Sequence, residues 1–291
     1  MRTHAQTTAL RQARSQLLAH GRCPDGLVAE GVARSWRRSL GAGLLPTGRL
    51  GWSDNLDQAA LSALRGRHQE LLAHALPVME FLFEQVRHTD SVVALAAPCG
   101  TLMHTQGDPC FLGRAERVAL MAGACWHEDQ RGTNAIGTAL AEMGPVQVHG
   151  AEHFLERNAF LTCAAAPILS GTGRLLGILD ISGEHSRGNP HTLGLVGTAA
   201  RMIENRLLVA GGARSLRLHL HAQPEGIGTV AEGILRLSED GPLLGANRAA
   251  LGWLGLSPSQ LGTLSLADLL DRPLQELLAR QQRRPGLPQA V

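Results

Sequence analysis

Lysine and tyrosine are both absent from the 291 residues, which limits the chemistry that this chain can perform. A phosphate-binding P-loop needs a lysine after its last glycine, and a Schiff-base enzyme needs a lysine amine. All 27 basic residues are arginine. The sequence therefore excludes P-loop nucleotide hydrolysis and lysine covalent catalysis, and we expect these residues to show no ATPase activity.

Aromatic residues are also scarce, at 3%, so the core must consist of leucine, valine, isoleucine and alanine. A net charge of +2 is too small for nucleic-acid binding through bulk electrostatics. No apolar run approaches the ~18 residues of a membrane span, and the N-terminus lacks the apolar segment of a signal peptide. Five cysteines at irregular spacings indicate reduced thiols. We expect a soluble cytoplasmic protein that does not bind membranes.

The N-terminal part of the chain has helical periodicity. One buried stripe is predicted from Val28, Val32, Trp36 and Leu40. The arginines beside it (Arg34, Arg37 and Arg38) are expected to form a solvated helix face. A second helical pattern covers residues 61–86, and Pro77 within it predicts a kink or two abutting helices.

Short apolar runs separated by turn residues begin near residue 90 and indicate strands. The order is two strands, a helix over residues 113–124, a glycine-containing segment, three further strands and a helix. The predicted strands are SVVALAAP, GTLMHTQGD, PVQVHG, FLTCAAAPIL and GRLLGILDISG. An antiparallel sheet with flanking helices suits this α+β order.

The helix after Pro190 carries a seam of apolar residues at alternating three- and four-residue steps: Leu193, Val196, Ala200, Ile203, Leu207 and Ala210. Such a seam packs either on the sheet of the same chain or against a second chain. We expect a homodimer held by helices around residues 58–86 and 191–210.

Beyond Gly211, the stretch GILRLSEDGPLLGANRAALGWLGL predicts strand, turn, strand and a helix beginning near Asn247. The helical part alone also resembles a DNA-binding helix-turn-helix. The hairpin pattern directly before it, and the few basic residues in its second helix, favour the first interpretation.

Two candidate binding residues lie on the last two strands of the sheet. Asp180 interrupts a nearly continuous apolar run, and a buried carboxylate needs a hydrogen-bond partner. Cys163 precedes three alanines, whose small side chains leave volume above a central strand. Asp180 is interpreted either as a structural acceptor or as the anchor of a ligand, and the small-residue strand either receives a helix side chain or lines a pocket.

The stretch WHEDQRGTNAIGTAL supplies two further candidates. Thr133 or Asn134 is expected to cap a helix through residues 135–141, with Trp126 covering the helix or the sheet. The same segment would form the lid of a small-molecule pocket if one exists. Because no paired-cysteine or paired-histidine motif accompanies His149 and His153, we predict no metal site and no cofactor.

These motifs together resemble a known family. WHEDQRGTNAIGTAL, PVQVHGAEHFLE, LTCAAAPI and GRLLGILDISG resemble the GAF sensor domain of acetoin-catabolism-type activators of sigma-54 RNA polymerase. VARSWRRSLGAGLLP is similar to the helical segment that opens those proteins, and GILRLSEDGPLLGANRAALGWLGL looks like the start of their PAS domain. The likeness covers roughly residues 28–270.

The resemblance implies three parts: an N-terminal helical region (1–84), a GAF sensor domain with its connecting helix (85–210), and an incomplete PAS-like domain (214–291). In the family such a region senses a metabolite, and other domains contact sigma-54 RNA polymerase and DNA. Those domains, with their Walker lysine, do not follow here, so we expect either an isolated sensory half or a naturally short homologue.

By resemblance, the effector is a small hydroxyketone, diol or related carbonyl compound, and the chain is not an enzyme. We predict ligand contacts from Trp126, Asn134, His153, Cys163 and Asp180. One alternative is a docking module controlled by a protein such as a metabolic kinase subunit. Another is a cysteine-dependent GAF reductase, which needs a low-pKa thiolate that sequence spacing does not establish.

Overall fold

The computed structural model describes residues 4–24, 26–48, 55–185, 189–212, 215–270 and 274–283, together with residues 285 and 288. The chain divides into two compact units. The N-terminal unit comprises Met1–Ile168 and Leu176–Ala200, and the C-terminal unit comprises Leu169–Leu175 and Arg201–Val291. None of the helices within the described ranges combines the length and hydropathy needed to cross a bilayer.

Four helices open the N-terminal unit: α1 (His4–His20), α2 (Glu30–Gly41), α3 (Gln58–Arg67) and α4 (Gln69–Val86). The expected break within residues 61–86 is present, but it lies at His68 and not at Pro77. Helix α4 continues through Pro77, which is exposed together with Ala73 one turn before it. Water can bond the carbonyl that a proline leaves without a partner, so the helix need not end there.

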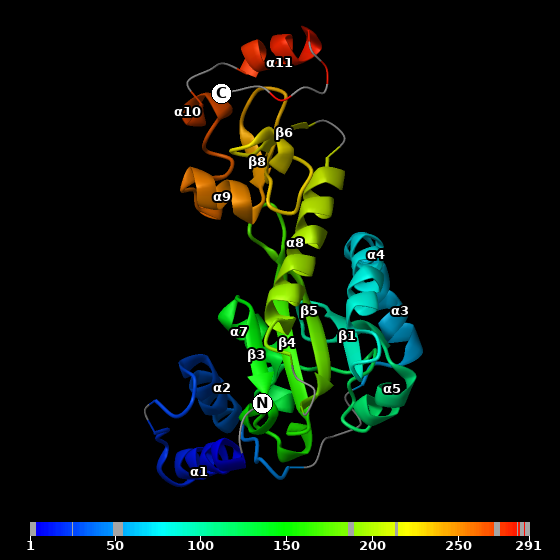
Figure 1. The fold of residues 1–291 in the computed structure, drawn as a ribbon, viewed down its shortest axis with the longest axis vertical. Helices are drawn as coiled ribbons and strands as arrows, with labels where there is room; N and C mark the ends of the chain where they lie inside the picture. The colour runs from blue at the N-terminus through cyan, green and yellow to red at the C-terminus, as the bar shows by residue number, and fades with distance from the viewer. Residues whose placement is uncertain are drawn as a thin grey trace. The chain divides into compact units, whose positions relative to one another are not determined.

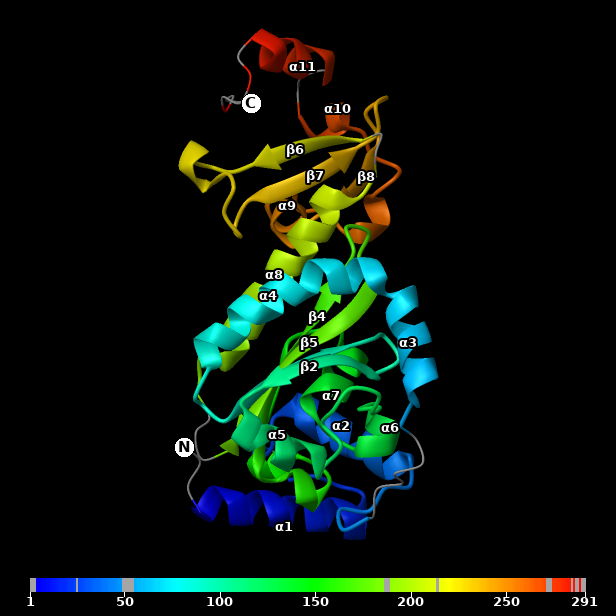
Figure 2. The ribbon, with the colours of Figure 1, turned by 90° about the vertical axis from the view of Figure 1, so that its right-hand side faces the viewer.

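The five predicted strands form one antiparallel sheet in the order β2-β1-β5-β4-β3, of which Figure 1 labels β1, β5, β4 and β3. The strands are β1 (Ser91–Ala96), β2 (Leu102–Gly107), β3 (Val146–His149), β4 (Leu161–Leu169) and β5 (Leu175–Glu184). Helix α4 packs on β1 and β2, and α3 packs on β2 (Figure 2). The expected α+β class with a GAF-like antiparallel sheet and flanking helices is confirmed.

The two faces of this sheet differ in what covers them. A side chain on Gly177 would touch Leu71, so odd-numbered positions of β5 face α4. Asp180, three residues later, therefore points to the opposite face, because successive strand residues alternate. Ala94 lies directly opposite Asp180 on β1, and Val148 lies opposite Cys163 on β3. The Asp180 carboxyl group thus has the short side chain of Ala94 as its neighbour on β1.

Short helices and turns connect β2 to β4: α5 (Pro109–Glu116), α6 (Glu128–Arg131), α7 (Ala135–Glu142), η2 (Gly150–Glu152) and η3 (Glu156–Asn158). The prediction of a helix over residues 113–124 is wrong in its bounds. The helix begins at Pro109 and ends at Glu116, and Ala119 and Gly123 have φ of 58° and 93°. Those left-handed backbone angles are incompatible with a continuous right-handed helix.

The C-terminal unit has a smaller, three-stranded sheet in the order β6-β7-β8. Its elements are β6 (Leu216–Leu220), η5 (Pro224–Gly226), β7 (Gly233–Leu237), β8 (Leu243–Ala246), α9 (Arg248–Leu254), η6 (Pro258–Gln260), α10 (Leu266–Leu269) and α11 (Leu274–Arg283). The predicted hairpin and the helix start at Asn247 are confirmed. Strand β6 was missed, although Leu216, Leu218 and Leu220 alternate as a strand requires.

Helix α8 (Thr192–Ala210) contains the predicted apolar seam. Val196, Ala200 and Ile203 are buried within the chain itself. The helix-turn-helix alternative is not supported, because α9 is followed by the single turn η6 and the four-residue helix α10.

Candidate functional site

Asp180 and Ser182 form a buried polar pair on β5, and both face away from α4. The Ser182 hydroxyl donates to Asp180 Oδ2 at 2.6 Å. Asp180 is fully buried, and its other oxygen, Oδ1, has no hydrogen-bond partner among the described residues. Burial raises the pKa of Asp180 to about 7, and the Ser182 hydrogen bond opposes that rise. A half-protonated carboxyl group can both donate and accept a hydrogen bond.

His153 and Cys163 lie beside this pair. The imidazole Nδ1 is 3.0 Å from the carbonyl of Gly150, which only accepts, so Nδ1 carries the proton. Its Nε2 is then an acceptor for the Cys163 thiol at 3.4 Å. The Ser182 hydroxyl and the Asp180 charge both act on the pKa of this thiol, so the four side chains form one cluster.

Burial keeps the histidine and the cysteine of this cluster neutral. It lowers the pKa of His153 to about 4, and it raises the pKa of Cys163 well above its ordinary value. A nucleophilic cysteine needs the opposite arrangement, a thiolate stabilised by a cation. The geometry therefore favours hydrogen bonding to an uncharged polar molecule over cysteine catalysis.

Sequence reasoning singled out three members of this cluster, His153, Cys163 and Asp180, but not Ser182. The signal for Ser182 was available, because residues two apart on a strand share a face. The other two predicted ligand contacts, Trp126 and Asn134, have their polar groups bonded to the main chain. The Trp126 indole donates to Ala119 O at 2.9 Å.

Asn134 is the expected helix cap of α7. Its Oδ1 accepts from Gly137 N at 2.8 Å, and its Nδ2 donates to the carbonyls of Trp126 and Gly132. A Cβ on Gly137 would lie 2.7 Å from Trp126 O, so this glycine permits a close approach of the helix to the chain. The glycines of WHEDQRGTNAIGTAL thus shape a compact segment over the sheet.

Helix α2 is joined to that segment by a buried polar network. Glu128 accepts from the Ser35 hydroxyl at 2.5 Å, from the Thr138 hydroxyl at 2.6 Å and from Arg38 Nε at 2.5 Å. Arg34 and Arg38 also pair with Glu142. The three arginines lie on an exposed face of α2, as expected, and two of them also form ion pairs with α6 and α7.

Helices α1 and α2 also hold the segment that carries His153. The Arg14 guanidinium, which is buried, donates to His153 O at 2.7 Å. The Trp36 indole donates to Glu152 O at 2.7 Å. The apolar side chains of the same helices pack on Phe154. Helices α1 and α2 thus hold the main chain at Glu152 and His153, while the His153 imidazole points toward Cys163 on β4.

Within the described ranges no group of three or more histidine, cysteine, aspartate or glutamate side chains is arranged to hold a metal ion. A five-stranded antiparallel sheet with flanking helices and a glycine-shaped segment beside it defines a domain of the GAF-like class. The family model for the MimR N-terminal domain matches residues 5–205. The chain belongs to this family.

Named relatives agree with that assignment. The chain is 33% identical over 199 residues to the acetoin dehydrogenase operon transcriptional activator AcoR of Bacillus subtilis, covering 67% of this chain and 33% of the relative. It is 31% identical over 291 residues to the acetoin catabolism regulatory protein of Cupriavidus necator, covering 91% of this chain and 44% of the relative. The chain thus spans less than half of each relative.

Among solved structures, the fold is similar to that of the Escherichia coli DhaR(N)-DhaL complex. The TM-score is 0.60 at 17% sequence identity, and the match covers 88% of this chain and 87% of the other. At this low sequence identity, the structural similarity supports the assignment of the fold alone. The relatives are transcriptional activators and regulators, so the predicted resemblance to acetoin-catabolism-type activators is confirmed.

Proposed function

We propose that this chain is the signal-sensing region of a sigma-54-dependent transcriptional activator acting in the cytoplasm. It binds a small oxygenated metabolite, such as a hydroxyketone, diol or related carbonyl compound, at the cluster of His153, Cys163, Ser182 and Asp180. The observation that carries this proposal is Asp180 Oδ1, a buried carboxyl oxygen without a partner. Buried polar groups are normally hydrogen-bonded, and a ligand hydroxyl would satisfy this one.

The names of the relatives supply the chemical class. Two of them regulate acetoin breakdown, and acetoin has a hydroxyl and a carbonyl on adjacent carbons. A half-protonated Asp180 can accept from the former or donate to the latter. The four side chains are at most 2% exposed, so entry requires the segment from Trp126 to Thr138 to move as a lid.

The remaining parts of the chain have proposed roles as well. Residues 1–84 and 85–210 form the helical region and the GAF sensor, and residues 214–291 form a PAS-like part. The chain itself is not an enzyme. Contacts with sigma-54 RNA polymerase and DNA belong to other parts of the activators that it resembles.

The proposal predicts that acetoin stabilises the folded chain. At about a hundredfold excess over its dissociation constant, linkage gives roughly 2.7 kcal/mol. For a chain of this size that is about 5–10 °C in Tm, at roughly 2–4 °C per kcal/mol. Differential scanning fluorimetry with acetoin, butanediols, dihydroxyacetone, short aldehydes and small alcohols measures the shift, and calorimetry gives the affinity of any hit. The matched control is 2-butanone, which lacks the hydroxyl and should shift Tm less.

Two variants locate the effect. Asp180→Ala removes the proposed anchor and Cys163→Leu fills the space beside it, so each should abolish the shift when compared with its own unliganded Tm. A shift that survives in both variants would place the ligand elsewhere and contradict the proposal.

A docking module is the second candidate, since the solved DhaR(N) fold is found in a complex with the protein DhaL. In that case the Asp180 cluster would be structural. If no small molecule binds while a metabolic kinase subunit does, this candidate replaces the first.

We also propose a homodimer through α4 and α8. Helix α4 exposes Ala73, Pro77 and Phe81 at four-residue intervals, and Phe81 is 53% exposed. Phe81→Glu should convert the dimer to a monomer at tens of micromolar in sedimentation velocity. Because Ile203 is buried, a charge there would test folding instead. Gln69→Glu adds the same charge about three turns away and should leave the dimer intact. A wild-type monomer under these conditions would contradict the proposal.

A further inference from the structure

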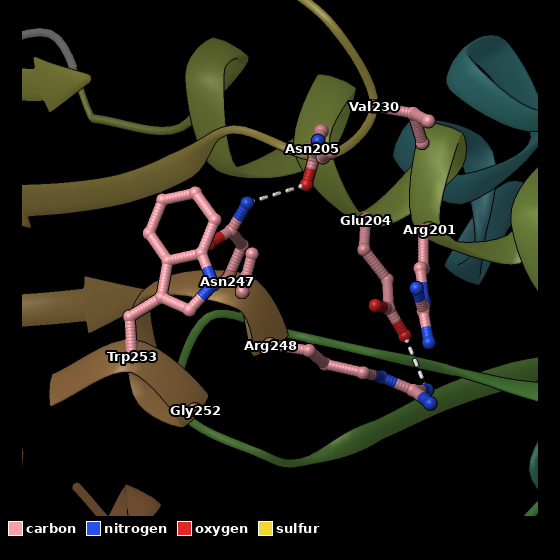
Figure 3. A pocket seen from close by; sticks show the side chains of 10 residues that line it. Arg201, Glu204, Asn205, Val230, Asn247, Arg248, Gly252 and Trp253 are labelled. Atoms are coloured by element: carbon pink, nitrogen blue, oxygen red, sulfur yellow. Dashed lines mark hydrogen bonds and ion pairs between the residues drawn. The ribbon is translucent and has the colours of Figure 1, made fainter. Parts of the chain in front are cut away.

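The C-terminal unit contains a pocket of about 320 Å³ that the proposed sensor function does not use (Figure 3). Helix α8 contributes Arg201, Glu204 and Asn205 to its wall, and α9 contributes Arg248 and Trp253. The volume is at the lower end of the range for small-ligand sites. The pocket therefore suits a compact molecule.

The wall between the two helices is rigid. Asn247 donates from Nδ2 to Asn205 Oδ1 at 2.9 Å and to Glu232 O at 2.8 Å. Its Oδ1 accepts from the main-chain N–H groups of Ile234 and Ala250, both at 2.9 Å. The amide is fully engaged, so it fixes the shape of the pocket and has no free group for a ligand.

The charges of the wall do not cancel. Glu204 is buried and accepts from Arg248 at 2.6 Å and from Leu169 N at 2.7 Å. Arg201 carries a second guanidinium on the exposed side. Its charge acts on Glu204, but no hydrogen bond or ion pair of Arg201 is found within the described part of the chain. Among the described side chains that line the pocket, two guanidinium groups thus accompany one carboxylate.

Trp253 supplies a flat apolar surface at the same pocket. Its side chain is 51% exposed, although large aromatic groups normally bury most of their area. The His221 ring packs against it edge-on, with the ring centroids 5.3 Å apart. The indole is thus held in place while part of its surface stays open.

We infer that this pocket is a second ligand site, which binds a small monocarboxylate with a flat apolar body. The ligand carboxylate pairs with Arg201, because a planar guanidinium is the preferred partner of a carboxylate. The apolar body of the ligand packs on Trp253. A neutral metabolite of the kind proposed for the Asp180 cluster would leave the excess charge unused. The two sites therefore select different chemical classes.

Isothermal titration calorimetry of the whole chain with benzoate tests this inference. Benzamide has the same shape without the charge and should bind at least tenfold more weakly, which corresponds to about 1.4 kcal/mol. Arg201→Gln should weaken benzoate at least tenfold. Trp253→Leu should weaken it severalfold while leaving the preference for benzoate over benzamide. Arg206→Gln removes an exposed arginine of the same helix outside the pocket and should bind as the wild type does.

Three results would overturn the inference. The first is the absence of benzoate binding at concentrations up to about 10 mM, ten times the dissociation constant of a millimolar complex. The second is equal affinity for benzoate and benzamide. The third is an equal loss of benzoate affinity in Arg201→Gln and Arg206→Gln. Arg201-dependent binding of a protein partner without benzoate binding would likewise reject a small-molecule site. Because Arg201 and Asp180 belong to different units, benzoate binding and acetoin stabilisation can fail independently.

Discussion

The stability of Asp180→Asn relative to the wild type should increase by about 4 kcal/mol from pH 4 to pH 8. The folded-state pKa of Asp180 is about 7, against an ordinary value of 3.8. Between these pH values the folded wild type retains a proton that the unfolded chain has lost, so wild-type stability falls as pH rises, by about 1.4 kcal/mol per unit. Asparagine does not titrate and removes this loss.

The comparison must be made as a difference between the two proteins. The buried amide of asparagine adds a constant offset of its own, but that offset does not change with pH. Urea unfolding at several pH values measures the difference. Asp240→Asn, at an exposed turn, is the matched control and should show no such trend. A difference that stays constant from pH 4 to pH 8 would contradict the raised pKa.

His153 contributes the opposite slope in part of the same range. Its pKa falls from 6.5 to about 4 on folding, so the unfolded chain binds a proton that the folded chain does not. The contribution of His153 to the free energy of unfolding is fully present above pH 6.5. It is lost as pH falls toward 4, and the total loss is about 3 kcal/mol. The two groups compensate in the wild type, and Asp180→Asn should expose the histidine slope.

Glu128→Ala is expected to destabilise the chain by about 3 kcal/mol, the lower end of the cost of breaking a buried ion pair. The alanine leaves the hydroxyls of Ser35 and Thr138 without their acceptor and leaves Arg38 without its buried partner. The lower end applies because the Arg38 side chain is 38% exposed and water can solvate it. Thermal and urea unfolding measure the loss.

Glu30→Ala is the matched control for this experiment. Glu30 also pairs with an arginine of α2, but its side chain is 87% exposed. Its removal should leave stability unchanged within error, since exposed pairs contribute little. Equal losses for Glu30→Ala and Glu128→Ala would show that the network beneath α2 does not stabilise the fold.

Much of the fold was predictable because it is encoded locally. Short apolar runs between turn residues located the five strands of the large sheet, and the Asn134 and Asn247 caps located two helix starts. The helix over residues 113–124 was misplaced because its end depends on left-handed backbone angles at Ala119 and Gly123. An alanine in the sequence gives no sign that its backbone will adopt a left-handed angle.

The candidate site was predictable only in part. A carboxylate in an apolar strand identified Asp180, and the absence of lysine excluded P-loop chemistry. Only the tertiary structure brought His153 and Cys163 to the Asp180–Ser182 pair, and only it placed Ser35 against Glu128, 93 residues away. The pocket beside Arg201 likewise needs two helices that are far apart in sequence. Strand alternation and caps arise from contacts within a few residues, whereas pKa shifts, ion-pair networks and pockets depend on which distant groups exclude water from one another.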